Sequence, residues 1–262
     1  THVPKVQKAD DASCVRSTQG NQMSNVLVVG DIHGCFDNLL SLIKARQKKT
    51  RLDAVIVCGD YGIWSDFKKE KIPAAYNVPY PCPVYFVDGN HENHHELDKY
   101  ERGKIHNIIG NLYFCAYGSV LTINKTKFLF CGGAASIDKG TRIPFKTWWP
   151  TECISESDTY FLPDEKIDVV ISHTAPSCVC KEICEQNKWS YDYAKSLDKS
   201  IAFLDNVLET YQPQRWYFGH WHTSYYAKKD LTKFIGLDTI PFVKKKDFNT
   251  DSCESCYTVL CV

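Results

Sequence analysis

The sequence lacks any apolar run that approaches the roughly 18 residues needed for a membrane-spanning helix. It also lacks, at its start, the basic and then apolar pattern of a secretory signal peptide. Lys plus Arg and Asp plus Glu both number 31, so no net charge draws the chain to nucleic acid or to a membrane. We therefore expect a soluble, cytoplasmic protein with no membrane partner. A nucleic-acid or nucleotide substrate stays open but is not indicated by charge.

Cysteine, in contrast, is abundant, but the 13 cysteines are an odd number and cannot all pair. Several of them, including Cys58 and Cys131, lie inside apolar runs typical of strands. Buried, reduced thiols are the simpler interpretation. The cysteines within 178–184 and 253–256 could be joined into a structural zinc site, but their spacing does not match the paired CxxC template.

A chain of 262 residues is long enough for one large α/β domain with a sizeable core. Residues 1–22 are polar and without periodicity, and they precede the only methionine, Met23. We expect 1–22 to be a disordered leader or an expression remnant and 23–262 to form a single domain. The pattern predicts helices over 37–48, capped by Asp37, and over 194–211. It predicts a hairpin over 120–131 and a strand over 257–261 that ties this end into a sheet.

Side chains that bind metals follow five apolar, strand-like runs, at 26–29, 54–58, 84–87, 169–171 and 216–218. Because α/β proteins place their sites beyond the carboxyl ends of strands, these side chains are candidates for one shared site. In chain order the polar residues are Asp31 and His33, Asp60, Asn90 and His91, His173, and His220 and His222.

This ordered set resembles the calcineurin-like metallophosphoesterase superfamily, whose pattern is Asp-x-His, Gly-Asp, Gly-Asn-His-Asp/Glu, a lone His and Gly-His-x-His. The resemblance covers roughly residues 26–234. The segment 132–150 looks more narrowly like small bacterial and phage members of that superfamily. The fold that the resemblance implies is a four-layer α/β/β/α sandwich with mixed sheets.

Two metal ions held side by side are the second implication of the resemblance. One ion would be held by Asp31, His33 and His222, the other by Asn90, His173 and His220, and Asp60 would bridge them. A bridging carboxylate can hold two cations about 3.5 to 4 Å apart, which clamps a phosphoryl group and an attacking water or hydroxide between them. Mixed imidazole, carboxylate and amide ligands suit Mn, Fe or Zn.

His91 resembles the superfamily's catalytic histidine, which would protonate the leaving oxygen or stabilise the transferred phosphoryl group. The neighbouring Glu92 is expected to support the turn. His94 and His95 match no motif position, so we interpret them as surface residues. The implied activity is metal-dependent hydrolysis of a phosphorylated substrate, either a phosphomonoester or a phosphodiester.

The sequence departs from the serine/threonine protein phosphatases of this superfamily, which carry two characteristic arginines. Ile63 and Trp64 stand where those enzymes have Asp-Arg, and Asp88 replaces the Arg before Gly-Asn-His. Arg142 is our candidate for binding substrate in their place, because a guanidinium matches phosphate oxygens in a bidentate fork. A surface position for Arg142 is the alternative. Trp148 and Trp149 could form a stacking wall or simply pack.

Two alternative functions remain beside the phosphoesterase. A serine/threonine protein phosphatase is disfavoured by the residues that replace the two arginines. A non-catalytic metal-binding scaffold for protein interaction, from another functional class, is disfavoured by the complete ligand set, since a scaffold has no need to keep every ligand.

Overall fold

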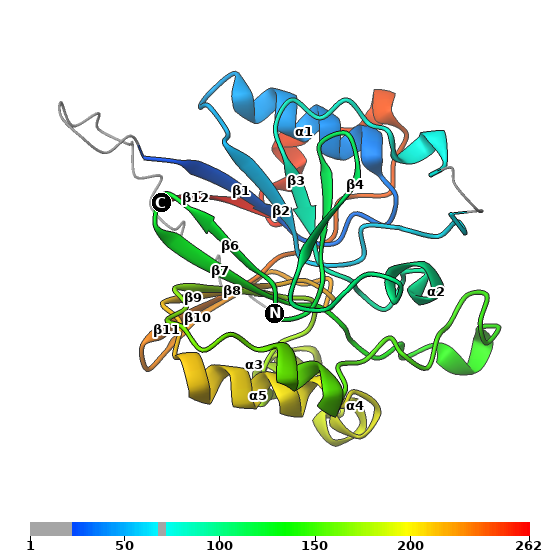
Figure 1. The fold of residues 1–262 in the computed structure, drawn as a ribbon, viewed down its shortest axis with the longest axis vertical. Coiled ribbons are helices and arrows are strands. Elements are labelled where there is room, and N and C mark those ends of the chain that lie inside the picture. Colours follow the sequence, from blue (N-terminus) through cyan, green and yellow to red (C-terminus); the bar gives the residue numbers. More distant parts are fainter. Residues whose placement is uncertain (1–22, 68–71) are drawn as a thin grey trace.

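A computed structural model of the chain describes residues 23–67 and 72–262. Two six-stranded mixed sheets are stacked face to face, and helices cover the two outer faces (Figure 1). This is the α/β/β/α sandwich that the sequence predicts. The expected disordered leader, residues 1–22, lies outside the described residues.

The first sheet has the strand order β12-β1-β2-β3-β5-β4. Within it, β1, β2, β3 and β5 run parallel, and β12 and β4 pair antiparallel at the edges. The predicted strand over 257–261 is therefore confirmed, and it pairs with β1. The bounds are β1 (Asn25–Val29), β2 (Ala54–Val57), β3 (Val84–Phe86), β4 (Ile105–Ile109), β5 (Leu112–Cys115) and β12 (Tyr257–Cys261).

The second sheet has the order β10-β11-β9-β8-β7-β6, with β7, β8, β9 and β11 parallel. Its strands are β6 (Val120–Ile123), β7 (Thr126–Cys131), β8 (Val169–Ser172), β9 (Arg215–Phe218), β10 (Tyr225–Lys229) and β11 (Thr232–Gly236). The predicted β6–β7 hairpin is confirmed. Asn124 and Lys125 in its tight turn have φ of 46° and 69°, the left-handed conformation that two-residue hairpin loops favour.

Helices α1 (Phe36–Gln47) and α2 (His94–Leu97) follow β1 and β3, and α1 covers the first sheet (Figure 1). Helices α3 (Ser177–Asn187), α4 (Tyr191–Leu197) and α5 (Ser200–Tyr211) lie on the side of the second sheet. The predicted cap of α1 is wrong, because the cap position is Cys35 and Asp37 lies inside the first turn. There its charge still favours the amino-terminal end of the helix.

The single helix expected over 194–211 is also wrong, since α4 and α5 are separate helices. Asp198 interrupts them with φ −105° and ψ 97°, an extended conformation. Its carboxylate accepts a hydrogen bond from the Ser200 backbone N–H at 2.9 Å. The Ser200 hydroxyl in turn accepts one from the Ile154 N–H at 2.9 Å. An Asp side chain that bonds nearby backbone competes with helix formation, and this explains the break.

Burial on both faces explains why the central strands read as continuous apolar runs. In β1, Leu27 and Val29 pack in the core that also contains α1, while Val26 and Val28 pack between the two sheets. A third core lies between the second sheet and helices α3 and α5. The parallel strands are thereby fixed in register, and their carboxyl ends come together at one edge of the sandwich. Within the described residues, no helix combines the length and apolarity needed to cross a membrane.

The thiols support the prediction of reduced cysteines. None of the 12 cysteines in the described part of the chain forms a disulfide, and eight of them, including Cys58 and Cys131, are buried. Burial raises the pKa of both of these thiols, which makes them less reactive.

We expect a thiol reagent at neutral pH to react first with the exposed Cys178 in the native protein. After denaturation without reductant, nearly all 13 thiols should react, because the 12 cysteines in the described part of the chain form no disulfide. Colorimetric thiol counting in the two states measures this. A denatured chain with most thiols paired would contradict the expectation.

Candidate metal centre

The predicted ligands come together where the carboxyl ends of the two sheets meet. Strands β1, β2 and β3 lead into Asp31, Asp60 and Asn90, while β8 and β9 lead into His173 and the pair His220 and His222. Each ligand therefore sits one to four residues beyond a buried strand. Rigid strands end directly at the site, which fixes the positions of the side chains.

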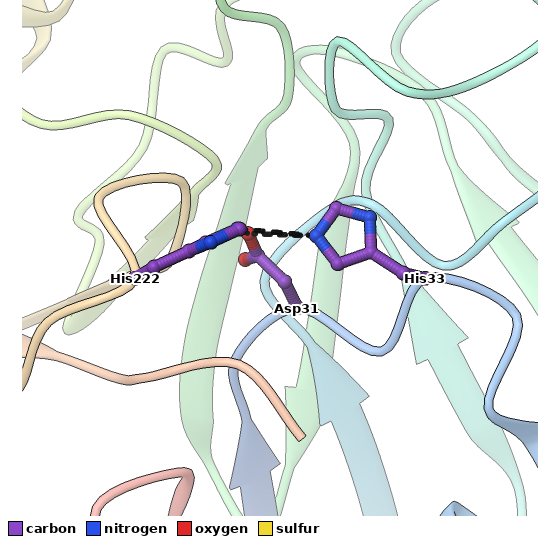
Figure 2. Close-up of side chains that lie close together, drawn as sticks. All are labelled: Asp31, His33 and His222. Carbon is purple, nitrogen blue, oxygen red and sulfur yellow. Dashed lines mark hydrogen bonds and ion pairs between the residues drawn. The ribbon is translucent and has the colours of Figure 1, made fainter. Parts of the chain in front are cut away.

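The first group consists of Asp31, His33 and His222, whose side chains point toward one another (Figure 2). The Nε2 atom of His222 lies 3.0 Å from Asp31 Oδ2 and 3.1 Å from His33 Nε2. His33 Nε2 is 3.7 Å from the same Asp31 oxygen. Atoms that each lie about 2.1 Å from a shared ion have separations of this size. These three side chains therefore have the geometry of a single ion site.

The second group is centred on His173, which is completely buried. Its Nε2 atom lies 3.1 Å from Asn90 Oδ1 and 3.5 Å from Asp60 Oδ2. The His220 ring packs edge-on against the His173 ring, with 4.9 Å between ring centroids. Asp60 Oδ2 is also 3.7 Å from His33 Nδ1, in the first group. The Asp60 carboxylate thus faces both groups, as a bridging ligand must.

Further hydrogen bonds orient these ligand atoms. His173 Nδ1 lies 2.8 Å from the carbonyl oxygen of Cys58, so a proton on Nδ1 leaves the Nε2 lone pair facing Asn90 and Asp60. Asn90 donates its amide N–H to Ser136 Oγ at 3.3 Å, which leaves its oxygen for the site. Imidazole, carboxylate and amide oxygen donors converge here, and this donor set fits divalent metal ions.

Four of the predicted ligands have left-handed backbone conformations. The φ angles are 42° at His33, 48° at Asp60, 67° at His220 and 45° at His222. Non-glycine residues adopt such angles in only a few per cent of cases, and strain of this kind gathers at functional sites. Gly89 is required for space rather than for its backbone angles. A Cβ atom there would overlap Asp60 Oδ1 and come 2.7 Å from His173 Nε2.

The two buried carboxylates, Asp31 and Asp60, attract positive charge into the site. Burial disfavours a charged His173, yet the two carboxylates raise its pKa to about 10. Burial and the neighbouring His173 lower the pKa of His220 to about 3. Asp60 is buried as well, but His173 and the other imidazoles lower its pKa. The same negative field that holds a proton on His173 favours a bound cation.

The predicted catalytic residue, His91, lies directly beside this cluster. Its backbone N–H donates to Asp60 Oδ1 at 2.8 Å, and its ring is 5.0 Å from the His33 ring, centroid to centroid. Burial lowers the pKa of His91, and Arg142 adds to this shift against the pull of Asp60. The lowered pKa favours the neutral form of the His91 imidazole at neutral pH when no substrate is bound.

Arg142 is not the surface residue of the alternative interpretation, because its side chain is only 8% exposed. Its Nη2 atom lies 2.7 Å from His91 Nε2 and 3.1 Å from Nδ1. Its Nη1 donates to the Asn90 carbonyl oxygen at 3.2 Å. The same guanidinium pairs with the Asp138 carboxylate at 2.7 Å. The loop that follows β7 thus brings a cation to the predicted catalytic histidine.

Glu92 supports the turn after β2, as expected from the sequence. Its buried carboxylate accepts hydrogen bonds from the backbone N–H groups of Gly62, at 3.2 Å, and Ile63, at 2.5 Å. Burial and the Asp60 charge raise the pKa of Glu92. The surface prediction holds for His95 but is wrong for His94, which is buried and lies 2.9 Å from the Gly89 carbonyl oxygen through its Nε2.

Sequence reasoning missed Glu152, a buried carboxylate behind Asn90. Its oxygens accept from the Ser136 N–H at 2.7 Å, the Ser136 hydroxyl at 2.6 Å and the Trp148 indole N–H at 2.8 Å. Trp148 therefore has a structural partner here. The only sequence signal was the Ser136 in a segment already marked by the resemblance, and nothing in the pattern linked it to Glu152.

Comparison with known proteins agrees with this geometry. The chain matches the family described as calcineurin-like phosphoesterase over residues 24–224. A lariat debranching enzyme of Entamoeba histolytica is 23% identical over 253 residues, covering 84% of this chain and 70% of the relative. A lariat debranching enzyme of Danio rerio is 23% identical over 257 residues, covering 81% of this chain but only 44% of the relative.

A shorter similarity joins the chain to serine/threonine-protein phosphatase 7 of Arabidopsis thaliana, at 34% identity over 86 residues. This covers 32% of the chain and 21% of that protein. The family match, by comparison, spans residues 24–224 and therefore includes all seven predicted metal ligands. The chain thus belongs to the calcineurin-like phosphoesterase family and is a metallophosphoesterase, an enzyme that hydrolyses phosphate esters.

Proposed function

We propose that this enzyme acts on phosphodiesters, with His91 as the general acid and Arg142 as the phosphate-binding residue. In this proposal Asp60 bridges two divalent ions of the Mn, Fe or Zn type. The remaining ligands divide between the ions, with Asp31, His33 and His222 on one and Asn90, His173 and His220 on the other. The observation that carries the choice of diester is the pairing of Arg142 with Asp138 beside His91.

The ions, when bound, would supply Lewis-acid polarisation of the phosphoryl oxygens and lower the pKa of water. The chain's own residues do the rest. Arg142 donates hydrogen bonds to a phosphoryl oxygen, and the Asp60 carboxylate fixes the backbone of His91. As the water loses one proton to the solvent and its oxygen forms a bond to phosphorus, the P–O bond to the leaving group breaks. The negative charge of a bound phosphate raises the pKa of His91 and so favours the imidazolium, whose proton passes to the leaving oxygen.

Charge at the phosphate-binding side favours the diester. A terminal phosphomonoester carries close to two negative charges at neutral pH, whereas a diester carries one. Arg142 already shares its charge with Asp138, so it neutralises less of a bound phosphate. Ile63 and Trp64 supply no charge where related protein phosphatases have an arginine. The site is therefore better matched to one negative charge than to two.

The names of the relatives support the same substrate class. The relatives from Entamoeba histolytica and Danio rerio are named lariat debranching enzymes, and opening a branch in a nucleic-acid lariat breaks a phosphodiester. A nucleic-acid diester is accordingly the substrate class that we favour. A protein phosphatase is the second candidate, supported by the local similarity to the Arabidopsis phosphatase and opposed by the charge argument.

To test whether Asp60 bridges the two ions, we consider Asp60→Ala. We expect this variant to lose both ions or to bind them much more weakly, because the Asp60 carboxylate faces both ligand groups. His33→Ala should lose mainly one ion. Metal analysis after dialysis of reconstituted protein measures both. Asp37→Ala, at an exposed acidic residue on α1, is the matched control and should retain the metal. Two ions held at full affinity by the Asp60 variant would remove the bridging role.

For the general acid, we expect His91→Ala to keep the metal and to lower turnover by about 10²- to 10⁴-fold. An aryl ester should suffer less than an alkyl ester, since its leaving oxygen needs less protonation. Steady-state kinetics on both esters measures the difference, and His95→Ala, at the exposed neighbour, is the control. Unchanged turnover of both esters would exclude His91 from the chemistry.

For the substrate class, we expect kcat/KM on an aryl phosphodiester to equal or exceed that on a phosphoserine peptide. Arg142→Ala should raise KM for an aryl monoester more than for the diester, because the monoester depends more on the cation. Arg51→Ala, at an exposed arginine that pairs with Asp53, serves as control. A phosphopeptide turned over far better than either small ester would replace this proposal with the protein phosphatase.

A further inference from the structure

A cavity of about 340 Å³ opens beside His91, on the same side as Arg142. Its volume falls within the range of small-molecule sites. We call it the Trp64 pocket, and its lining residues are Trp64, His91, Arg142, Lys146, Thr147 and Trp149. It contains none of the seven proposed metal ligands, so it is available to the part of a substrate that projects away from the ions.

Trp64 is held in a fixed orientation although it is 53% exposed. Its indole N–H donates to the carbonyl oxygen of His91 at 2.8 Å. Its backbone N–H donates to the Tyr76 hydroxyl at 3.0 Å. The ring lies so close to Gly34 that a Cβ atom there would be 2.8 Å from the indole. Single exposed aromatics are common on surfaces, but this one is anchored to the backbone of the proposed acid.

The other walls of the pocket combine an aromatic ring with positive charge. Trp149 is 7% exposed and presents a second indole, whereas Arg142 and Lys146 supply two cations. Fixed aromatic walls with neighbouring cations are the features that bind nucleobases in single strands, where a base stacks on a ring and the backbone meets positive charge. An aliphatic group would gain less from these walls, because it offers no flat ring to stack on an indole.

We propose that the Trp64 pocket binds the nucleobase of the nucleoside that leaves, with the base stacked on Trp64. The inference rests on the proposed function, because His91 both lines the pocket and protonates the leaving oxygen in that proposal. The group attached to that oxygen must then lie on the pocket's side. Trp64 accordingly determines specificity for the leaving group, while the ligand groups and Arg142 hold the phosphate.

The kinetic test uses the metal-reconstituted full chain and two diesters that differ only in the leaving group. One is a dinucleoside monophosphate, from which a nucleoside leaves. The other carries the same nucleotide esterified with methanol, so that methanol leaves instead. Trp64→Leu should lower kcat/KM for the dinucleoside by about 5- to 100-fold, the range given by stacking of one base on an aromatic side chain. The methyl ester should change by no more than about twofold, and Trp64→Phe should recover most of the loss.

Trp189→Leu is the matched control, because Trp189 is 51% exposed and does not line the pocket. Equal losses on both diesters in Trp64→Leu would overturn the proposal, since Trp64 would then merely support the His91 loop. Unchanged kinetics on the dinucleoside would overturn it as well, and so would equal losses in the Trp64 and Trp189 variants.

A binding measurement separates this inference from the proposed function. Adenosine and ribose contain no phosphate ester, so ligand-observed NMR can compare their binding without turnover. Adenosine should bind the wild type at least about 5-fold more tightly than ribose, and Trp64→Leu should abolish the difference. If the wild type cleaves no diester, the proposed function fails while this preference still decides for or against the base site.

Discussion

The Asp60 carboxylate is the group on which the remainder of the site depends. It is buried, and a buried carboxylate is costly unless hydrogen bonds or opposite charges compensate it. One oxygen accepts the His91 backbone N–H, and the other faces His33 and His173. These partners come from three different strand ends in two sheets, so the compensation exists only when both sheets are assembled. The fold therefore determines where these partners of Asp60 can meet.

Glu92 stabilises the turn that carries Asp60. It secures the turn after β2 through backbone hydrogen bonds, and it sits two residues beyond Asn90. A single short segment after β3 thus carries a proposed ligand, the proposed acid and the support for the bridging residue's turn. In the same segment, position 89 must be glycine, because Asp60 and His173 occupy the space that a Cβ atom would need.

Much of this arrangement was predictable because its causes are local. Strands buried on both faces produce continuous β-branched runs, and Asp, Asn and His follow directly at their ends, so the strands and the side chains that gather beyond them were predictable from the pattern. The sandwich itself was predicted from the family resemblance that the order of these motifs carries. The break between α4 and α5 was not predictable from periodicity, because the competing hydrogen bond belongs to Asp198. The apolar spacing on either side of it continues as though one helix ran through.

Contacts between segments that are distant in the sequence were not predictable for a different reason. His94 is polar and follows a loop, yet it is buried against the Gly89 carbonyl oxygen. The carboxylate of Glu152 orders Ser136, and Asp138 pairs with Arg142, through conformations of one loop that no periodic pattern describes. The left-handed backbones of His33, Asp60, His220 and His222 likewise follow from the tertiary geometry of the site rather than from the preferences of these residues.

The pairing of β1 with β12 bears on the order in which the molecule is assembled on the ribosome. β1 ends at Val29, and its antiparallel neighbour β12 begins only at Tyr257. The turn that carries Asp31 also depends on late residues, because the Ile240 N–H donates to the Asp31 carbonyl oxygen at 2.8 Å. A nascent chain therefore presents β1 with one open edge throughout most of translation, a state prone to mispairing. The hydrogen bond that Ile240 donates to the Asp31 turn can form only after synthesis has passed residue 240.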